Sequence, residues 1–378
     1  MTTRNFPAFV ALAFVSLFSA SAFGQSIVTN TNDSGAGSLR TAISTGGNID
    51  FDPVLFSTPQ TITLTTPFAL SFNDFSINGP GADLLTIDGT FSNEEIFFIQ
   101  SGVVNIAGVT LSGANNAPVV TDLTNGIFLR GDLTLDGVAI SDFQSEGVFN
   151  QGGNLAVLNS TIANNGDVGI FVQSGTSTVN NSTIVGNGDV GIFVQSRTST
   201  VTVNNSTIVG NGEEGIDSNG ASSVNNSTIA NNGDAGILAG PLGNISINSS
   251  IVANNNNGNG DLSAFGPLNL TSSLILDSDF ENGVSGNIIG VDPLLGPLGN
   301  NGGSTQTLLL GAGSPAIDAG SNPLGLALDQ TGANRVFGPQ VDIGATEFVP
   351  ASVPEPGSLG LIGAIGLAFI ARRNKRAA

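Results

Sequence analysis

The chain has 378 residues, of which 40% are hydrophobic, so it can bury a core in one or two domains. Its formal net charge is −20, because 29 acidic residues outnumber nine Lys and Arg. We therefore expect no binding to nucleic acid, whose phosphates require basic contacts. The chain contains no Cys and no His, which excludes a disulfide framework and removes the commonest general base and metal ligand.

Residues 1–24 have the pattern of a secretory signal peptide. Arg4 precedes an apolar run from Phe9 to Phe18, and small residues follow up to Gly24. The apolar run is too short to span a bilayer, so the alternative is a buried N-terminal helix. We predict that the mature chain begins near Gln25.

Residues 25–56 are predicted to form an N-terminal cap. Residues 27–43 contain a β-rich run, a Gly-rich turn and the triplet Ser38-Leu-Arg40. This segment resembles the start of many secreted bacterial β-helix proteins, in which it closes the first coil. A cap is needed because the open strand edges of a solenoid must be covered. We expect Arg40 to pair with a carboxylate in a structural role.

A short repeat organises residues 57–349. The phrase Asn159-Ser-Thr-Ile162 recurs so that successive isoleucines, Ile162, Ile184, Ile208, Ile229 and Ile251, are 22, 24, 21 and 22 residues apart. About 22 residues leave room for three short strands and three corners, which predicts an all-β parallel β-helix with coils stacked about 4.8 Å apart. The chain resembles the pectin-lyase-like family, which implies a right-handed solenoid. Asn at the repeated corners favours stacked Asn ladders.

Residues 314–347 form a second distinctive segment. It contains Ser314-Pro-Ala-Ile-Asp318, Asp329, Arg335 and Val341-Asp342. The segment resembles the closing module of secreted β-helix proteins called choice-of-anchor Q, although that family has Arg at the place of Thr331 and an aromatic residue at the place of Thr346. The resemblance implies a C-terminal cap, in which we expect Asp318, Asp329, Arg335 and Asp342 to form ion pairs and turns.

Residues 350–378 carry a predicted sorting signal. Pro354, Glu355 and Pro356 precede an apolar stretch at residues 357–371, and Arg372 and Arg373 open a basic tail. The three parts in this order resemble the PEP-CTERM signal of Gram-negative bacteria. The resemblance implies an exosortase-type partner, a short C-terminal transmembrane helix that anchors the chain transiently, and delivery to the cell surface or extracellular matrix. The alternative is an ordinary C-terminal anchor helix.

Three rows of residues emerge when the coils are aligned on a repeated Gly, such as Gly169 or Gly191, that directly precedes an Ile or Val predicted to point inward. Two residues after it stand aromatic rings: Phe128, Phe149, Phe171 and Phe193. Four residues after it stand polar side chains: Arg130, Gln151, Gln173 and Gln195. Two residues before it stand acids: Asp167, Asp189, Glu213 and Asp234. These rows are the candidate site residues.

Strand alternation predicts that the Phe and Arg/Gln rows point outward and form a flat strip suited to the sugar rings of an extracellular polysaccharide. The alternative is that the Phe residues pack in the core or lie beneath the excursion at residues 112–125. The like charges in the acidic row repel one another, and a bound Ca²⁺ ion would relieve this repulsion. The alternative is that the carboxylates are solvated at the surface and bind no metal. No cofactor is required by either reading.

The sequence favours a structural, adhesive or glycan-binding protein of the bacterial surface. The alternative is an extracellular polysaccharide lyase or glycoside hydrolase. The sequence disfavours an enzyme, because Lys is absent from residues 25–350 and no catalytic residue can be assigned. Acidic polysaccharides are the least favoured ligands because the chain is itself strongly negative.

Overall fold

The computed structural model describes residues 24–70, 74–89, 95–113, 125–255, 260–278 and 284–350. Apart from Gly24 and Pro350, the predicted signal peptide and the predicted sorting signal lie outside the described residues. Within these ranges no helix has the length and apolar character needed to cross a membrane.

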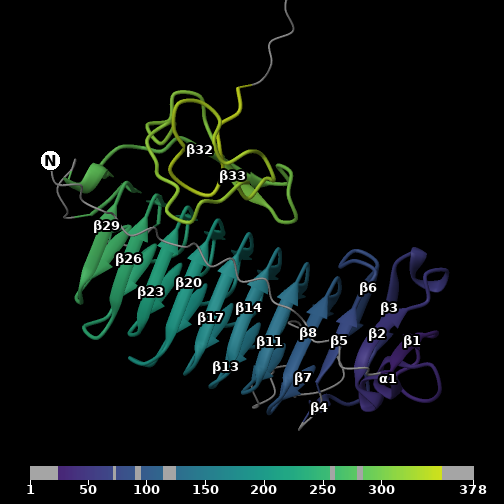
Figure 1. Ribbon diagram of the computed structural model, residues 1–378. Helices are drawn as coiled ribbons and strands as arrows, with labels where there is room; N and C mark the ends of the chain where they lie inside the picture. The colour runs from purple at the N-terminus through teal and green to yellow at the C-terminus, as the bar shows by residue number, and fades with distance from the viewer. Residues whose placement is uncertain are drawn as a thin grey trace, which may run out of the picture.

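Three parallel sheets run side by side along one axis and form a solenoid (Figure 1). Sheet A contains β1 (Gln25–Val28), β2 (Gly47–Phe51), β5 (Phe75–Asn78), β8 (Val103–Ala107), β11 (Asp132–Asp136), β14 (Asn154–Leu158), β17 (Thr176–Asn180), β20 (Thr200–Asn204), β23 (Ala221–Asn225), β26 (Asn244–Asn248) and β29 (Leu268–Thr271). Sheet B contains β3 (Gln60–Thr63), β6 (Leu85–Asp88), β9 (Thr110–Ser112), β12 (Ala139–Ser141), β15 (Thr161–Ala163), β18 (Thr183–Val185), β21 (Thr207–Val209), β24 (Thr228–Ala230), β27 (Ile251–Ala253), β30 (Leu274–Ile275) and β31 (Ile288–Ile289). Sheet C contains β4 (Phe68–Leu70), β7 (Phe97–Ile99), β10 (Ile127–Leu129), β13 (Val148–Asn150), β16 (Ile170–Val172), β19 (Ile192–Val194), β22 (Ile216–Ser218), β25 (Ile237–Ala239) and β28 (Leu262–Ala264).

The register of sheet A confirms the predicted coil length. Asn154 pairs with Thr176, which pairs with Thr200, then Ala221 and then Asn244, so successive turns contribute 22, 24, 21 and 23 residues. The solenoid has about 10 turns of about 23 residues each. From β2 to β28 each turn supplies one strand to each sheet, so residues one turn apart become neighbours across the sheet.

The core fills the inside of the solenoid because the strands alternate. In β16 and β19 the first and third residues are buried and the middle one is half-buried. Ile162 and Ile184 of the repeated phrase are fully buried. Large inward side chains from the three sheets meet on the axis, and burying them drives folding.

The corners of the coils depend on asparagine in two ways. Asn159 and Asn181 begin the repeated phrase with a φ of 50°, a left-handed conformation that Asn tolerates better than most residues. A second, buried row forms a ladder in which the Asn165 side chain donates to Asn187 and the Asn187 side chain donates to Asn211, both at 2.9 Å. An Asn ladder therefore forms in this second row, while in the row of the repeated phrase the Asn205 side chain bonds to Asn181 and Asn159 bonds to Asp136 instead.

The N-terminal segment covers the first turn with α1 (Leu39–Thr45), and η1 (Leu55–Ser57) follows β2. The Ser38 side chain accepts from the backbone N–H of Thr41 and caps the start of α1. Arg40 pairs with Asp33 at 2.6 Å and lies 4.6 Å from the centre of the Phe68 ring. This confirms the predicted pairing of Arg40 with a carboxylate.

Residues 291–349, here called the C-terminal module, follow η2 (Val284–Gly286) and contain the antiparallel pair β32 (Leu295–Gly299) and β33 (Thr307–Leu310). The module folds back along the outside of sheet B (Figure 1). The Thr183 hydroxyl donates to the carbonyl of Gln306, and the Thr207 hydroxyl donates to the Gln330 side chain, both at 2.6 Å. Residues 314–347, which the sequence predicted to be a C-terminal cap, therefore lie along the flank of several turns.

The outer face of sheet B explains this placement. Every residue of β21, β24 and β27 is buried, whereas β12 alternates between buried and half-buried positions. Val209 and Ala230 point away from the axis and pack against Leu308 of the module. A sheet with apolar residues on both faces needs a cover on both, and the module supplies the outer one.

A buried ion pair holds the module together. Arg335 is fully buried, and its Nε lies 3.5 Å from Glu347 Oε1. Its Nη2 donates to the carbonyls of Asp342 and Gly344. The predicted ion pair thus forms with Glu347, while Asp329 and Asp342 accept hydrogen bonds from backbone N–H groups and hold turns. Burial raises the pKa of Glu347 to about 7.

Candidate functional site

Five aromatic rings form a continuous row on the outside of sheet C. Adjacent ring centres are 5.0, 5.1, 4.9 and 5.0 Å apart along the row Phe98, Phe128, Phe149, Phe171 and Phe193. Each ring belongs to the half-buried middle residue of a three-residue strand. The rings therefore point away from the core, as strand alternation predicts.

Phe98 is a member of the row that the Gly alignment missed. In its turn the position of the repeated Gly is occupied by Ile96, so the alignment has no anchor there. The run Ile96-Phe-Phe-Ile99 carries the same alternation, and Phe98 pairs with Phe128 in register. The strand pattern, rather than the Gly, was the signal that could have found it.

Polar side chains border the ring row at the end of the same strands. Arg130 Nε donates to Gln151 Oε1 at 2.6 Å, and the Arg130 guanidinium lies 5.3 Å from the centre of the Phe128 ring. Gln173 is half-buried and Gln195 is exposed one and two turns further on. We call the five rings and these four polar residues the aromatic strip.

The excursion at residues 112–125 was the predicted alternative cover for the ring row. Residues 114–124 of this segment lie outside the described residues. Cover of the strip by the excursion therefore stays a prediction.

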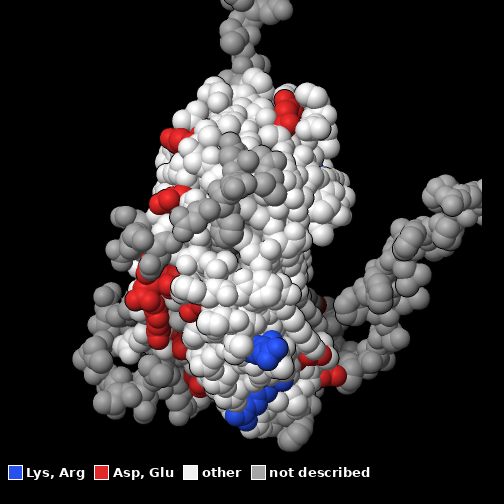
Figure 2. All heavy atoms as spheres, turned by 90° about the vertical axis from the view of Figure 1, so that its left-hand side faces the viewer, with Lys and Arg blue, Asp and Glu red and all other residues white. Residues whose placement is uncertain are grey.

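The four predicted acids stack at the corner between sheets B and C. The backbone N–H of Asp189 donates to the carbonyl of Asp167, and the same bond joins Glu213 to Asp189 and Asp234 to Glu213. We call these four residues the acidic corner. Figure 2, which views the solenoid from the β29 end, shows many Asp and Glu side chains along the left side of the molecule, with others at the upper right and beside the basic side chains at the lower right.

Two carboxyl groups of the acidic corner, those of Asp167 and Glu213, have raised pKa values. Burial, a hydrogen bond with Asp189 and the nearby Glu146 and Asp189 charges raise the pKa of Asp167 to about 6. The hydrogen bond and charge of Asp189 raise the pKa of Glu213 to about 7. Both raised pKa values therefore reflect how close Asp167 and Glu213 lie to Asp189, on the turns before and after it.

Asp217 joins the acidic corner to the aromatic strip. It pairs in register with Phe193, so it continues the ring row by one turn. Burial and the charge of Asp189 raise its pKa to about 6. Burial also raises the pKa of Glu214, beside Glu213. Asp217 stands two residues after Gly215, where earlier turns have Phe, so the spacing from the repeated Gly gave it no part in the acidic group.

Metal binding by the acidic corner stays a prediction. Across the part of the chain that the structure describes, no group of three or more acidic, His or Cys side chains converges in an arrangement that could hold a metal ion. The acids of the corner succeed one another along the axis, one for each turn. A Ca²⁺ ion would therefore have to bridge the carboxylates of adjacent turns.

Comparison with known proteins supports the fold and the sorting signal. Residues 85–256 match the family model described as the right handed beta helix region, and the solenoid is right-handed. Residues 352–376 match the PEP-CTERM protein-sorting motif. This motif indicates a secreted protein that an exosortase recognises and processes at the cell surface. The resemblance of residues 314–347 to choice-of-anchor Q lies outside both matches and stays a prediction.

Solved structures with a similar course of the chain include two carbohydrate-active proteins. Pectate lyase Pel9A is 14% identical, with 86% of this chain and 96% of that chain covered and a TM-score of 0.46. The A-module of the mannuronan C-5 epimerase AlgE4 from Azotobacter vinelandii is 12% identical, with 62% and 79% covered and a TM-score of 0.42. No curated protein sequence matches the chain.

Proposed function

We propose that this protein is a structural or adhesive element of the bacterial cell surface or matrix that binds neutral polysaccharide along the aromatic strip. The PEP-CTERM motif supports the location, because it marks secreted proteins that reach the surface. The ring row supports the binding, because it is an ordered and repeated pattern on the outer face of the described solenoid.

The spacing of the rings carries the proposal. Phe149, Phe171 and Phe193 stack with interplanar angles of 20° and 24°, so their edges form a regular apolar ridge about 5 Å per turn. The C–H groups of a sugar ring pack against such a ridge. The Gln side chains beside it both donate and accept hydrogen bonds, which suits hydroxyl groups.

The neighbouring charge restricts the ligand. Asp217 stands in line with Phe193, and Asp189 is close enough to raise the pKa of Asp217. A polyanion on the strip would meet these carboxylates and the net charge of −20. Neutral polysaccharides are therefore the preferred class.

Affinity electrophoresis of the full chain through gels that contain a neutral β-glucan tests the proposal. We expect the protein to be retarded and the double variant Phe171→Ala, Phe193→Ala to lose about tenfold in affinity, since two stacked rings are removed. Phe265→Ala is the matched control, because Phe265 is exposed outside the strip. Equal retardation of all three proteins would contradict binding at the strip.

The second candidate is a polysaccharide lyase or glycoside hydrolase, and Asp217 favours it. A carboxyl group with a pKa of about 6 at the end of a sugar-binding strip is suited to act as a general acid. An assay for new reducing ends or unsaturated products separates the two functions. Product release that Asp217→Asn or Arg130→Ala abolishes would establish the enzyme and overturn a purely adhesive role.

We further propose that residues 357–371 anchor the chain transiently before exosortase cleavage near Pro354. The apolar stretch and the following Arg372 and Arg373 support this order of events. Mass spectrometry of the secreted protein tests it, with Glu355→Ala as the variant. A mature protein that retains residues 357–371 would contradict cleavage.

A further inference from the structure

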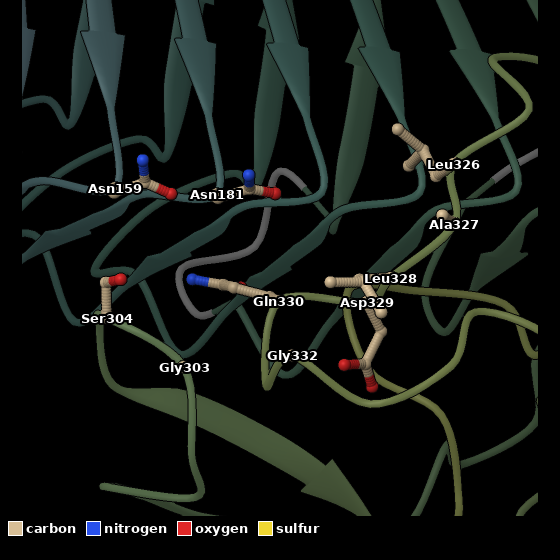
Figure 3. A pocket seen from close by; sticks show the side chains of 10 residues that line it. All are labelled: Asn159, Asn181, Gly303, Ser304, Leu326, Ala327, Leu328, Asp329, Gln330 and Gly332. Atoms are coloured by element: carbon tan, nitrogen blue, oxygen red, sulfur yellow. The ribbon is translucent and has the colours of Figure 1, made fainter.

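We propose a second and separate binding site, for one neutral sugar unit, in the seam between the solenoid and the C-terminal module. A cavity of about 320 Å³ opens there. Figure 3 shows Asn159 and Asn181 side by side on the solenoid wall, with Ser304, Leu328 and Gln330 on the module wall. This site does not depend on the aromatic strip, which lies on a different sheet.

The solenoid wall is one end of a row of asparagines. Asn159, Asn181, Asn205 and Asn226 each begin the repeated phrase, and each has a φ between 45° and 50°. The shared backbone conformation and the stacked coils bring these four side chains into line along the axis. The row thus presents the same amide group once per turn.

The module covers the later half of this row with its own backbone. The Asn226 side chain donates to the carbonyl of Ser321 at 2.8 Å. The Asn205 amide lies 3.1 Å from the backbone nitrogen of Gln330 and 3.2 Å from the carbonyl oxygen of Ala345. Where the module covers the row, the Asn side chains therefore form hydrogen bonds with backbone N–H and C=O groups of the module.

The earlier half of the row lines the cavity. Asn159 Nδ2 donates to Asp136 Oδ1 at 2.8 Å, and the side chains of Asn181 and Asn205 are 2.7 Å apart. A carboxamide has two donor hydrogens and an acceptor oxygen, so these contacts use only part of its capacity. Hydroxyl groups of a ligand both donate and accept hydrogen bonds. At Asn159 and Asn181 they would make the contacts that the module backbone makes at Asn205.

The module wall is apolar and firmly held. Leu328 is 50% exposed and Leu326 is half-buried, so both offer hydrocarbon to the cavity. Next to them, Gln330 is buried and bonded through both ends of its amide, to Thr207 and to Thr183. A fixed wall of this kind binds without first being ordered.

The lining excludes other classes of ligand. None of the described residues that line the cavity is Lys or Arg, so an anion would find no counter-charge. Asp329 is nearly fully buried, and its carboxylate accepts from Thr331, Ala333 and Glu347, so it is not free for a cation. The volume is at the lower end for ligand pockets, which suits one sugar unit with an apolar face and several hydroxyls.

Saturation-transfer NMR on the full chain tests the site with methyl β-glucoside, N-acetylglucosamine and the anion glucuronate. We expect transfer to the two neutral sugars, weakened about tenfold by the double variant Asn159→Gly, Asn181→Gly, since Gly keeps the left-handed backbone but removes the amide. Asn164→Gly is the matched control, because Asn164 has a φ of 55° outside the cavity. Leu328→Arg, at an exposed position, fills the cavity without disturbing the solenoid.

Several outcomes decide the matter. Loss of transfer in both seam variants, with transfer kept in Asn164→Gly and in Phe171→Ala, Phe193→Ala, supports the site. A neutral tetrasaccharide that binds while the monosaccharides do not would also support it, and would identify a chain end as the natural ligand. Absence of transfer to any neutral sugar, equal transfer to glucuronate, or loss only in the strip variant would overturn it. The strip proposal is unaffected by these failures.

Discussion

The hydroxyl of Thr207 on β21 donates to the side chain of Gln330, 123 residues later, at 2.6 Å in a buried position. Gln330 Nε2 in turn donates to Ser182 and Thr183 on the preceding turn, both at 3.1 Å. One side chain therefore joins two turns of sheet B to the C-terminal module, and it fixes where the module lies on the solenoid.

Replacing Gln330 should release the module. Gln330→Leu leaves the buried Thr207 hydroxyl without its partner, and such a loss costs about 1–3 kcal/mol. We expect faster limited proteolysis within residues 291–349, while the solenoid persists. Gln340→Leu is the control, because Gln340 is exposed in the same module. Equal protease resistance of the two variants would show that Gln330 does not hold the module.

The opposite orientations of neighbouring residues in β19 give a second test. Ile192 is fully buried and Phe193 is half-buried. Ile192→Ala should cost about 2–5 kcal/mol of unfolding free energy because it leaves a cavity, whereas Phe193→Ala should cost clearly less. Urea unfolding of the two variants measures the difference. A larger loss for Phe193→Ala would place its ring in the core.

The repeat predicted the solenoid well because local spacing determines it. Isoleucines such as Ile162 and Ile184 lie one turn apart, so their interval gives the coil length directly. Strand alternation likewise gave the direction of the Phe row. These features need only the residues within one or two turns, which the sequence displays in order.

The position of the module could not be obtained in the same way. The contact between Thr207 and Gln330 joins parts of the chain that share no local pattern. A signal did exist in the outward residues of sheet B, because Val209, Ala230 and Ala253 are apolar where an exposed strand would be polar. Those residues predict that something covers β21 to β27, without identifying the cover.

The buried pair of Arg335 and Glu347 gives a third prediction. Arg335→Leu leaves the Glu347 carboxyl buried without its partner, and breaking such a pair costs about 3–5 kcal/mol. The double variant Arg335→Leu, Glu347→Leu removes both charges and should recover much of that loss. Thermal unfolding of the three proteins measures the coupling. A double variant as unstable as Arg335→Leu alone would show that the pair stabilises the module through the packing of its side chains and not through its charges.

Calcium gives a fourth prediction, at the acidic corner. If Ca²⁺ bridges Asp189 and Glu213 on adjacent turns, millimolar CaCl₂ at pH 8 should raise the apparent melting temperature by roughly 2–4 °C. Asp189→Asn should remove this rise, and MgCl₂ should not reproduce it, since Mg²⁺ demands stricter geometry. An unchanged melting temperature in CaCl₂ would end the calcium hypothesis.

The acidic corner should also make the protein more stable in mild acid. The folded state raises the pKa of Asp167 from 3.8 to about 6 and that of Glu213 from 4.5 to about 7, so it binds more protons than the unfolded chain between about pH 4 and 7. The resulting stabilisation is complete below the unfolded pKa values and is lost as the pH rises through the folded ones. The apparent melting temperature should therefore fall by roughly 3–6 °C between pH 4.5 and pH 8.

Asp189 is the residue that couples the other two, so its replacement should flatten this dependence. Asp189→Asn removes the charge that raises both pKa values and should increase the melting temperature at pH 8 more than at pH 4.5. Asp83→Asn is the control, because it removes one exposed charge away from the corner. Differential scanning calorimetry across this pH range measures the effect. Identical pH profiles for the two variants would show that the acidic corner does not control acid stability, because Asp189 belongs to the corner and Asp83 does not.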